Sequence, residues 1–325
     1  MLQRRTLLFA PCLLLGAAAR AQSGTAGNYP EKPVTVLAPF APGGTVDIVA
    51  RLLAKNMSED LHQTFLIENR GGAGGTIATA ILAHATPDGY TLMVQHMGLA
   101  FNAGLYDNLS FDTARDVLPV ANIGTTPNVL VVTNSLPVKT VAEFLAYAKK
   151  NPKRINYGSG GVGSAGHVSM EVLQASTGVQ LTHVPYKGSG PAIIDLISGQ
   201  IQAMLLTIPA VMSFIRSGKV RAIATSGRER SPALPNLPTI GESGVKNFEY
   251  APWYGLFAPR DTPVAVVDLL HDEVNKVLAM PDIVTQLGQQ GLEVHAMSRA
   301  QFAGIVSHDI VAWSRTIKKL GLRGE

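Results

Sequence analysis

The stretch "PFAPGGTVDIVARLLA" (39–54) decides the fold prediction. It follows the apolar run "VTVLA" (34–38), which is typical of a buried strand, and its second half has apolar residues at helical spacing. The chain therefore runs from a strand through two glycines into a helix. Glycine-rich turns at 70–76 and 157–167 repeat this arrangement. Because ligands of open parallel sheets bind beyond the carboxyl ends of the strands, we expect these turns to line one site.

Strand-like runs and helical patterns alternate along most of the chain. Examples are "TFLIEN" (64–69) and "NVLVVT" (128–133), each followed by a helical pattern. The alternation predicts an α/β fold with mainly parallel sheets flanked by helices, and a length of 325 residues suggests two domains. After a proline-rich connection (229–247), two helices at about 263–279 and 299–320 are predicted to return onto the first domain.

Residues 1–21 have the pattern of a cleavable signal peptide. Arg4 and Arg5 precede the apolar run 6–15, and small residues ending at Ala21 provide a cleavage site. The paired arginines also fit a twin-arginine export signal. Paired arginines are common in ordinary signals, so the general secretory route is favoured. We therefore expect an exported protein.

Charge and cysteine content exclude several classes of protein. The only cysteine, Cys12, lies in the predicted signal, so we expect no disulfide and no cysteine-ligated metal. Removing the signal takes away three arginines and lowers the formal net charge from +4 to +1. Without a basic stripe, nucleic acid is not an expected partner. The histidines are scattered and no carboxylates cluster at ligand spacing, so neither a metal nor another cofactor is predicted.

The segment "GSGGVG" (158–163) matches the dinucleotide-binding pattern G-x-G-x-x-G between a strand and a helix. That interpretation requires an acidic residue about 20 residues further on, at the end of the next strand. The next strand, "QLTHVPY" (180–186), has no acid, and the first one after it is Asp195. A G-x-x-x-x-G-K-[ST] motif is absent from the sequence as well. The pattern therefore argues against a nucleotide ligand.

Ser164 and His167 leave a hydrolase open as an alternative. They lie three residues apart at a predicted helix start, where their side chains can meet. No G-x-S-x-G elbow surrounds Ser164, and no acid is evident to orient His167. A helix-capping serine is the simpler interpretation. The alternative function is an exported hydrolase acting on carboxylate esters or amides.

The glycine turns themselves point to an anionic ligand. Turns without bulky side chains expose backbone N–H groups, which together with the positive end of a helix bind carboxylate or phosphate. Each helix end contributes roughly 0.3–2 kcal/mol, and a hydrogen bond to a charged group about 1.5–3 kcal/mol. Micromolar binding requires about 8 kcal/mol, which two or three such turns closing on one anion can supply.

Two further features have both a structural and a ligand-binding interpretation. With Thr45 as N-cap, Asp47 in the first helical turn complements the helix dipole and caps backbone donors, and a ligand contact is compatible with that role. Trp253 and Tyr254, in a late predicted strand, either pack in the core or form a cleft wall against the apolar part of a ligand.

The sequence resembles the Bug family, the substrate-binding proteins of tripartite tricarboxylate transporters, from about Tyr29 to the C-terminus. The resemblance is carried, in one order, by "PFAPGGTVDIVARLLA" (39–54), "ENRGGAGGTIATA" (68–80), "TPDGYTL" (86–92), "TPNVLVV" (126–132), "YGSGGVGSAGHV" (157–168), "HVPYKGSGPAIIDLISGQI" (183–201), "RSPALPNLPTIGESG" (230–244) and Trp253 before "GLFAP" (255–259). It implies a two-lobed periplasmic binding protein of the type II-like class, with the ligand cleft between the lobes. Lobe 1 would comprise 28–127 plus 256–325, and lobe 2 would comprise 128–255.

The resemblance also implies a function and a set of ligand-binding residues. A small organic carboxylate would be captured between the lobes and delivered to membrane transporter subunits, without catalysis. The residues that correspond to the family's cleft are Ala41, Gly43, Gly44, Thr45, Asp47, Gly74, Gly75, His96, Met97, Ser159, Gly163, Ser164 and His167.

The sequence departs from the family pattern at two places near the implied cleft. Leu206 and Thr207 stand where many members have an acid followed by Asn, and His96 and Met97 replace small polar residues. Leu206 thus joins the candidate ligand-binding residues, and an apolar, aromatic ligand body is the hypothesis that follows. A ligand-loaded receptor for a sensor kinase ectodomain is a further alternative. We expect a monomer, because a hinged receptor must close freely.

Overall fold

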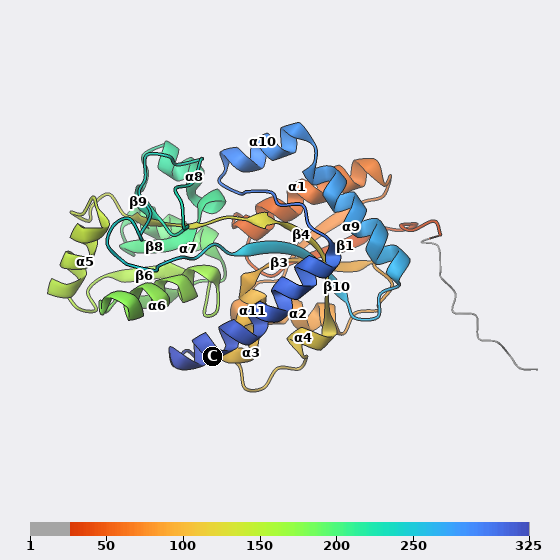
Figure 1. Ribbon diagram of the computed structural model, residues 1–325, viewed down its shortest axis with the longest axis horizontal. Coiled ribbons are helices and arrows are strands. Elements are labelled where there is room, and N and C mark those ends of the chain that lie inside the picture. The colour runs from red at the N-terminus through yellow and green to blue at the C-terminus, as the bar shows by residue number, and fades with distance from the viewer. Residues whose placement is uncertain (1–26, 325) are drawn as a thin grey trace, which may run out of the picture.

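A computed structural model of the protein describes residues 27–324, and it has two lobes (Figure 1). The predicted signal peptide, 1–21, lies outside the described residues. Each lobe is built on one five-stranded sheet. Within residues 27–324, no helix combines the length and the apolar character that crossing a membrane requires.

The sheet of lobe 1 has the strand order β2-β1-β3-β10-β4. Strand β1 pairs in parallel with β2 and β3, whereas β10 pairs antiparallel with β3 and β4. The strands are β1 (Val34–Ala38), β2 (Phe65–Asn69), β3 (Thr91–His96), β4 (Val117–Thr125) and β10 (Trp253–Pro259).

The sheet of lobe 2 has the order β7-β6-β8-β5-β9. Strand β6 pairs in parallel with β7 and β8, whereas β5 pairs antiparallel with β8 and β9. The strands are β5 (Asn128–Val132), β6 (Asn156–Ser159), β7 (Thr182–Pro185), β8 (Ala203–Thr207) and β9 (Arg221–Thr225).

The prediction of mainly parallel sheets needs correction, because each sheet is mixed. The parallel half of each sheet consists of strands joined through helices, as the alternation predicts. The antiparallel half contains a strand that enters directly from the other lobe: β5 follows β4 without a helix between them, and β10 returns after β9. A strand arriving from outside the lobe needs no crossover helix, so it can run against its neighbours.

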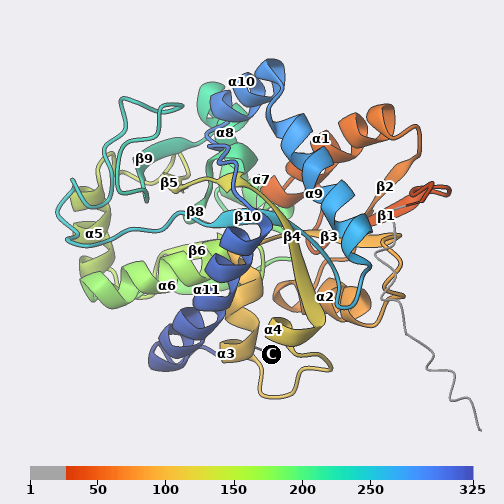
Figure 2. The same ribbon diagram turned by 45° about the vertical axis from the view of Figure 1, so that its right-hand side comes forward.

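Helices cover both faces of the lobe 1 sheet (Figure 2). Helices α1 and α9 bury their apolar sides on one face, and α2, α3 and α11 bury theirs on the other. Three C-terminal helices follow β10 where two were predicted; the missed one, α10, lies between them. The helices of this lobe are α1 (Thr45–Asp60), η1 (Ala73–Gly75), α2 (Thr76–Ala83), η2 (Met97–Phe101), α3 (Asn102–Leu105), α4 (Thr113–Asp116), α9 (Val264–Leu278), α10 (Pro281–Gln289) and α11 (Arg299–Lys319).

The lobe 2 sheet is likewise enclosed by two helix layers. Helices α5 and α6 pack on one face, and α7 and α8 on the other. Their bounds are α5 (Val141–Lys150), α6 (Ala165–Thr177), α7 (Ser189–Ser198) and α8 (Ile208–Arg216).

The chain crosses between the sheets twice, from β4 to β5 and from the segment after β9 into β10. The crossings lie side by side, since the N–H of Thr126 donates to the carbonyl of Pro252 at 3.2 Å. A third segment joins them, because Thr125 and Glu293 exchange two backbone hydrogen bonds. These crossings fall near the lobe boundaries of the sequence analysis, which stay a prediction.

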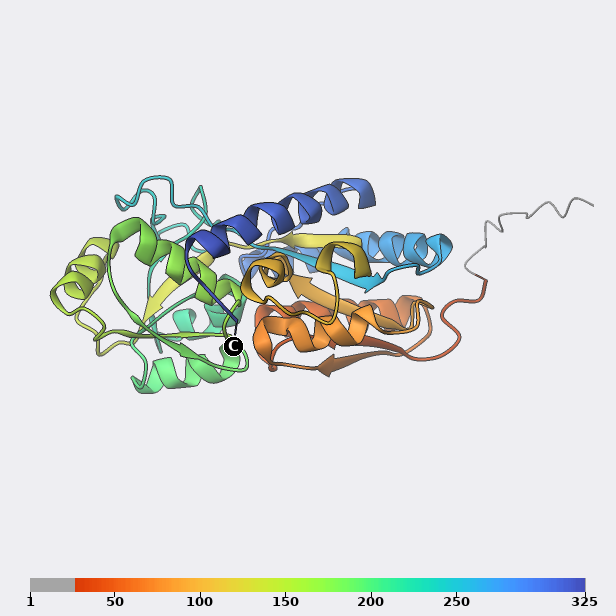
Figure 3. The ribbon, with the colours of Figure 1, turned by 90° about the horizontal axis from the view of Figure 1, so that it is seen from below.

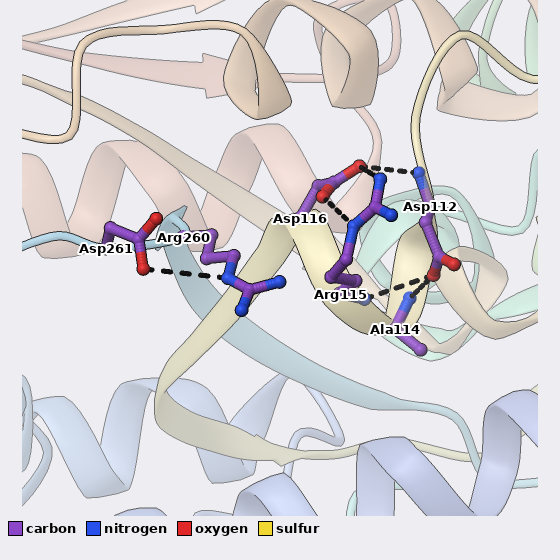
Figure 4. Close-up of polar contacts among 6 residues, drawn as sticks. All are labelled: Asp112, Ala114, Arg115, Asp116, Arg260 and Asp261. Carbon is purple, nitrogen blue, oxygen red and sulfur yellow. Dashed lines mark hydrogen bonds and ion pairs between the residues drawn. The ribbon is translucent and has the colours of Figure 1, made fainter.

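A charged cluster fixes the entry into β4, far from the ends of β10 and β4 that adjoin lobe 2 (Figure 4). The Asp112 carboxylate caps α4 by accepting from the N–H groups of Ala114 and Arg115. Arg115 donates to Asp116, and this bond, together with the N–H of Asp112, lowers the pKa of Asp116 to about 2. Its acids are thus satisfied locally, so the cluster is structural.

Candidate functional site

The two lobes lie side by side (Figure 3), and a cavity of about 50 Å³ is lined by residues of both. A water molecule requires roughly 10–15 Å³ of such space, so the cavity has room for several waters or for one small acidic group with a short chain. None of its lining residues carries a full charge at neutral pH. They are Phe40, Gly44, Thr45, Val46, His96 and Tyr254 of lobe 1, and Ser159, Gly160, Ser164, Ala165, Gly166, Ser189, Met204, Leu206 and Thr207 of lobe 2.

The lobes touch through turns in which two glycine positions have no room for a Cβ atom. The N–H of Ala41 donates to the carbonyl of Lys187 at 2.9 Å, across the cleft. A Cβ atom on Gly188 would lie 2.8 Å from the backbone nitrogen of Ala41, and one on Gly190 would lie 2.6 Å from the carbonyl oxygen of Pro42. Glycine is therefore required for this degree of closure.

Four helices begin at the cavity: the first residues of α1, α6 and α7 line it, as does Thr207, the N-cap residue of α8. Helices α1 and α7 have glycine N-caps, Gly44 and Gly188, and neither has a side-chain cap. Their first-turn N–H groups are consequently free to serve a ligand. The two ends face each other, since a Cβ on Gly44 would lie 3.0 Å from Ser189 Oγ. Converging helix N-termini make the cavity attractive to anions without any cationic side chain.

Asp47 holds the first turn from behind and does not line the cavity. Its carboxylate accepts from the Gly43 N–H at 3.1 Å and from Asn69 Nδ2 at 2.9 Å, and it pairs with Arg51 at 2.9 Å. Burial alone would raise the pKa of Asp47, but these bonds, led by that of Arg51, outweigh burial and lower it. The expectation that Thr45 is the N-cap was wrong: Gly44 is the cap, and Thr45 is the first helical residue.

His96, at the end of β3, presents an uncharged ring to the cavity. Its Nδ1 accepts from the N–H of Gly98 at 2.7 Å, so the neutral ring carries its proton on Nε2. The ring stacks on Phe40 with centroids 5.0 Å apart and meets Tyr254 edge-on. Burial lowers the pKa of His96 to about 3, which keeps the ring neutral at physiological pH.

Three hydroxyl groups meet where the lobes join. Thr45 Oγ1 of lobe 1 lies 2.7 Å from Thr207 Oγ1 of lobe 2. The Tyr254 hydroxyl interacts with both of these threonines, while burial raises its pKa. Tyr254 is thus a wall of the cavity. Its neighbour Trp253 is not, because its indole donates to Asp309 at 2.8 Å and its ring packs on Phe302.

The glycine-rich turn of lobe 2 rests on neutral rings and hydroxyls. Ser159 Oγ lies 2.7 Å from His183 Nε2 and accepts from the N–H of Gly161. His167 Nδ1 accepts from the N–H of Gly163 at 3.2 Å, and its ring stacks on that of His183 with centroids 4.2 Å apart. Burial lowers the pKa of His167 to about 3 and that of His183 to about 4.

The two members of the hydrolase alternative do not form a nucleophile–base pair. Ser164 Oγ accepts from the backbone N–H of His167 at 3.3 Å, as an N-cap does. The Nδ1 atom of the His167 ring is occupied by the N–H of Gly163. In the described part of the chain, no group of three or more His, Cys, Asp or Glu side chains is placed to hold a metal ion.

The structure brings six of the fourteen predicted site residues to the cavity. These are Gly44, Thr45, His96, Ser159, Ser164 and Leu206. The others support the turns or pack beside them: Ala41, Gly43 and Asp47 in the first turn, Gly74 against the carbonyl of Val162, Gly75 against Gln95, Met97 in the apolar core, and Gly163 and His167 below the lobe 2 turn.

The sequence analysis missed several lining residues, and some of them had a signal. Ser189 follows "YKG" in a fourth glycine-containing turn, which has the same strand–turn–helix pattern as the other three. Thr207 was noted only as the neighbour of Leu206. Phe40, Val46, Gly160, Ala165, Gly166 and Met204 are apolar or glycine residues whose part in the site depends on tertiary packing.

Two lobes, two adjacent crossings and a cavity at converging helix ends define the class of solute-binding proteins. Within that class the chain belongs to the tripartite tricarboxylate transporter receptor family, which it matches over residues 49–322. It is 32% identical to protein BugT of Bordetella pertussis over 313 residues, 96% of each chain. These comparisons confirm the resemblance to the Bug family.

Solved structures agree with this assignment. The chain is 37% identical to a Rhodopseudomonas palustris protein, Rpa4515, described with adipate; the match covers 91% of this chain and 99% of that one, with a TM-score of 0.88. MatC from the same organism, described with bound malate, is 36% identical over 89% of this chain and all of that one, with a TM-score of 0.85. The two-lobed fold predicted from the sequence is confirmed.

Proposed function

We propose that this receptor captures a small organic carboxylate between its lobes and delivers it to the membrane subunits of a tripartite tricarboxylate-type transporter. The observation that carries the proposal is the pair of uncapped helix ends, α1 and α7, which face each other across an uncharged cavity. Backbone donors of two helices bind a carboxylate and place one positive end from each lobe against it. Anion binding then stabilises the closed arrangement.

The ligand is a short aliphatic acid rather than an aromatic one. The aromatic hypothesis depended on His96, Met97 and Leu206 together, and Met97 is buried in the apolar core instead of facing the cavity. A volume of about 50 Å³ favours a short chain. Relatives described with adipate and malate support this choice.

The protein acts by binding, without catalysis. Ser164 serves as a helix cap and His167 as a support for the turn, so neither is arranged for covalent chemistry. Delivery by a hinged, periplasmic monomer fits the two adjacent crossings and the predicted signal peptide, for which the general secretory route is preferred. Docking of the loaded receptor on a sensor kinase ectodomain remains a second use of the same closed form.

A panel of acids tests the carboxylate proposal. After release of any carried-over ligand by partial unfolding, thermal unfolding would be followed with malate, succinate, adipate and benzoate, and with phosphate and nicotinamide dinucleotide as controls. A ligand at 100 times its Kd adds about 2.7 kcal/mol, which raises the midpoint by several degrees. A rise with an aliphatic acid and none with the controls is expected. A rise with phosphate or the dinucleotide alone would overturn the proposal.

Two serines of α7 provide a matched pair for the site itself. Ser189 lines the cavity at the start of the helix, and Ser198 is exposed at its other end. We expect Ser189→Ala to weaken binding of the best acid about 3- to 10-fold, and Ser198→Ala to leave it unchanged. Equal affinities for both variants would show that the Ser189 hydroxyl does not contact the ligand.

A further inference from the structure

His96 offers one hydrogen-bond donor that no residue of the described chain, 27–324, uses. Its Nδ1 is occupied by the N–H of Gly98, and its backbone N–H donates to Gln95 Oε1 at 2.9 Å. Nε2–H has no acceptor within residues 27–324, although the residue is only 5% exposed. A ligand that fills the cavity without accepting from this donor would leave the N–H buried and unpaired, which is costly. Since His96 lines the cavity, that acceptor belongs to whatever occupies the cavity.

The ring is held so that it can present only this atom. It stacks on Phe40 at an interplanar angle of 11° and meets the Tyr254 ring at 70°. Gly98 fits under it only because it has no side chain: a Cβ there would lie 2.3 Å from His96 Cε1 and 2.7 Å from Nδ1. Tyr254, the titratable group in ring contact with His96, is itself kept neutral, since burial raises its pKa.

The His96 donor lies apart from the helix N-termini that are proposed to bind the first carboxylate. One carboxylate of the ligand is served by the facing N-termini of α1 and α7, one from each lobe. His96 comes from β3, at a third point of the cavity wall, and it is the one lining imidazole among side chains that otherwise offer hydroxyls or apolar groups. A fixed neutral donor of this kind recognises an oxygen acceptor without requiring a charge.

We propose that His96 is a specificity-determining residue that donates from Nε2 to a second oxygen acceptor of the ligand, so that the cavity selects acids with two acceptor groups over monocarboxylates of equal length. The inference rests on the proposed carboxylate binding. The physical reason is asymmetric: a monocarboxylate would leave the N–H buried without a partner, and sites built around a hydrogen bond reject analogues that lack the partner strongly.

Matched acids and a ring-conserving variant test the inference. Calorimetry on the purified protein would compare succinate with butyrate and adipate with hexanoate. We expect the wild type to prefer the dicarboxylate of at least one pair by about 10- to 100-fold. His96→Phe keeps the stack on Phe40 and removes the donor, so the preference should shrink to about 3-fold or less, through weaker dicarboxylate binding and through monocarboxylate binding that no longer leaves an N–H unpaired.

Further variants separate the donor from the packing of the ring. His96→Gln restores an N–H at similar reach and should recover part of the preference. Gly98→Ala retains His96 but forces its ring to move, because the added Cβ would overlap the ring. It should lower the preference for dicarboxylates as His96→Phe does. Its control is Gly288→Ala, where a Cβ would meet nothing within 4 Å.

The possible outcomes distinguish this inference from the function on which it rests. Binding of dicarboxylates with a preference that survives in His96→Phe, or equal losses for both acids of a pair, would overturn the role of His96 and leave the receptor function standing. No binding of any acid by the wild type would overturn both. Recovery of the preference in His96→Gln supports donation specifically.

Discussion

The turns at 39–47 and 157–167 have the same strand–glycine–helix plan but are held in opposite ways. Behind the first turn lies an ionised carboxylate, Asp47, satisfied by Arg51, Asn69 and the Gly43 N–H. Among the residues that the structure describes, no ion pair supports the second turn, which rests on the Ser159 hydroxyl and the stacked imidazoles of His183 and His167. The difference decides which helix donors remain for a ligand.

In the first turn, the side chain that stabilises the loop does not occupy the start of α1, so the helix end stays open. In the second turn, Ser164 caps α6 and uses one of its donors. The helix ends of lobe 2 that lack a side-chain cap at the cavity are instead those of α7, which begins after Gly188, and α8, which begins after Thr207. Similar sequence patterns thus serve two purposes: the turn at 39–47 offers donors to the ligand (the grip turn), and the turn at 157–167 mainly supports the site (the scaffold turn).

The largest effect is expected from Asp47→Ala. The change leaves the Gly43 N–H, Asn69 and Arg51 without their common acceptor, which we expect to cost about 1–3 kcal/mol of unfolding free energy. The loosened turn no longer aims the α1 donors, so affinity for the ligand should fall by about 30-fold or more. Denaturant unfolding and calorimetry measure the two effects.

Asp282→Ala is the matched control, because Asp282 also occupies the first turn of a helix, α10, but is exposed. It should change neither quantity appreciably. If Asp47→Ala lost stability but bound the ligand with normal affinity, ligand binding by lobe 1 would not depend on the order of the 39–47 turn.

Gly74→Ala tests closure without touching a donor. A Cβ on Gly74 would lie 2.4 Å from the carbonyl oxygen of Val162, which belongs to the scaffold turn of the other lobe. The lobes then cannot approach fully, and affinity should fall by about 10-fold because the binding-competent form is less populated. Isothermal titration gives the affinity.

The left-handed backbone of Gly74, with φ of 60°, would strain an alanine by itself. Gly178→Ala separates this effect, since Gly178 has φ of 70° and nothing within 4 Å of its Cβ position. Equal affinities for the two variants would show that the contact with Val162 plays no part in binding.

The scaffold turn should be the acid-sensitive one. The pKa of His183 is lowered to about 4 and that of His167 to about 3, against about 6.5 in an unfolded chain. The unfolded state therefore binds more protons, so stability is complete above about pH 6.5 and is lost as the pH falls toward 4. Around His183 stand Tyr157, Ser159 and His167.

Thermal unfolding at pH 7.5 and pH 5 measures this loss. His183→Gln removes one titrating group and keeps a polar partner for Ser159, so its midpoint should fall less between the two pH values than that of the wild type. His84→Gln, at an exposed position, serves as control. An unchanged pH dependence in His183→Gln would contradict the assignment.

The sequence predicts the parts of the fold that depend on local pattern. Strand β1, helix α1 and their glycine turn follow from apolar spacing and turn chemistry, and the return of the C-terminal helices onto lobe 1 is confirmed. Strand β4 was not foreseen, because Pro119 and Asn122 interrupt its apolar pattern; a proline is tolerated there since β4 is an edge strand. The mixed strand directions depend on the crossings between lobes, which no local pattern encodes.

The candidate site was predictable at the level of turns but not of atoms. The strand–turn–helix pattern correctly predicted that Thr45, Ser159 and Ser164 lie at the cavity. It did not indicate that Met97 turns into the core while its neighbour His96 faces the cavity, because that choice is made by the stack on Phe40 and the bond from Gly98. Tyr254 needed the pairing of β10 with β3 to reach the site.

The smallest effect sharpens the distinction between grip and scaffold. Ser164→Ala removes the cap of α6 and should cost about 1 kcal/mol of unfolding free energy, as does Thr140→Ala, which removes the equivalent cap of α5 away from the cavity. Because Ser164 serves mainly as a scaffold, ligand affinity should change by no more than about 3-fold in either variant. A tenfold loss confined to Ser164→Ala would mean that both glycine turns grip the ligand, and that the cap on α6 opens toward it on binding.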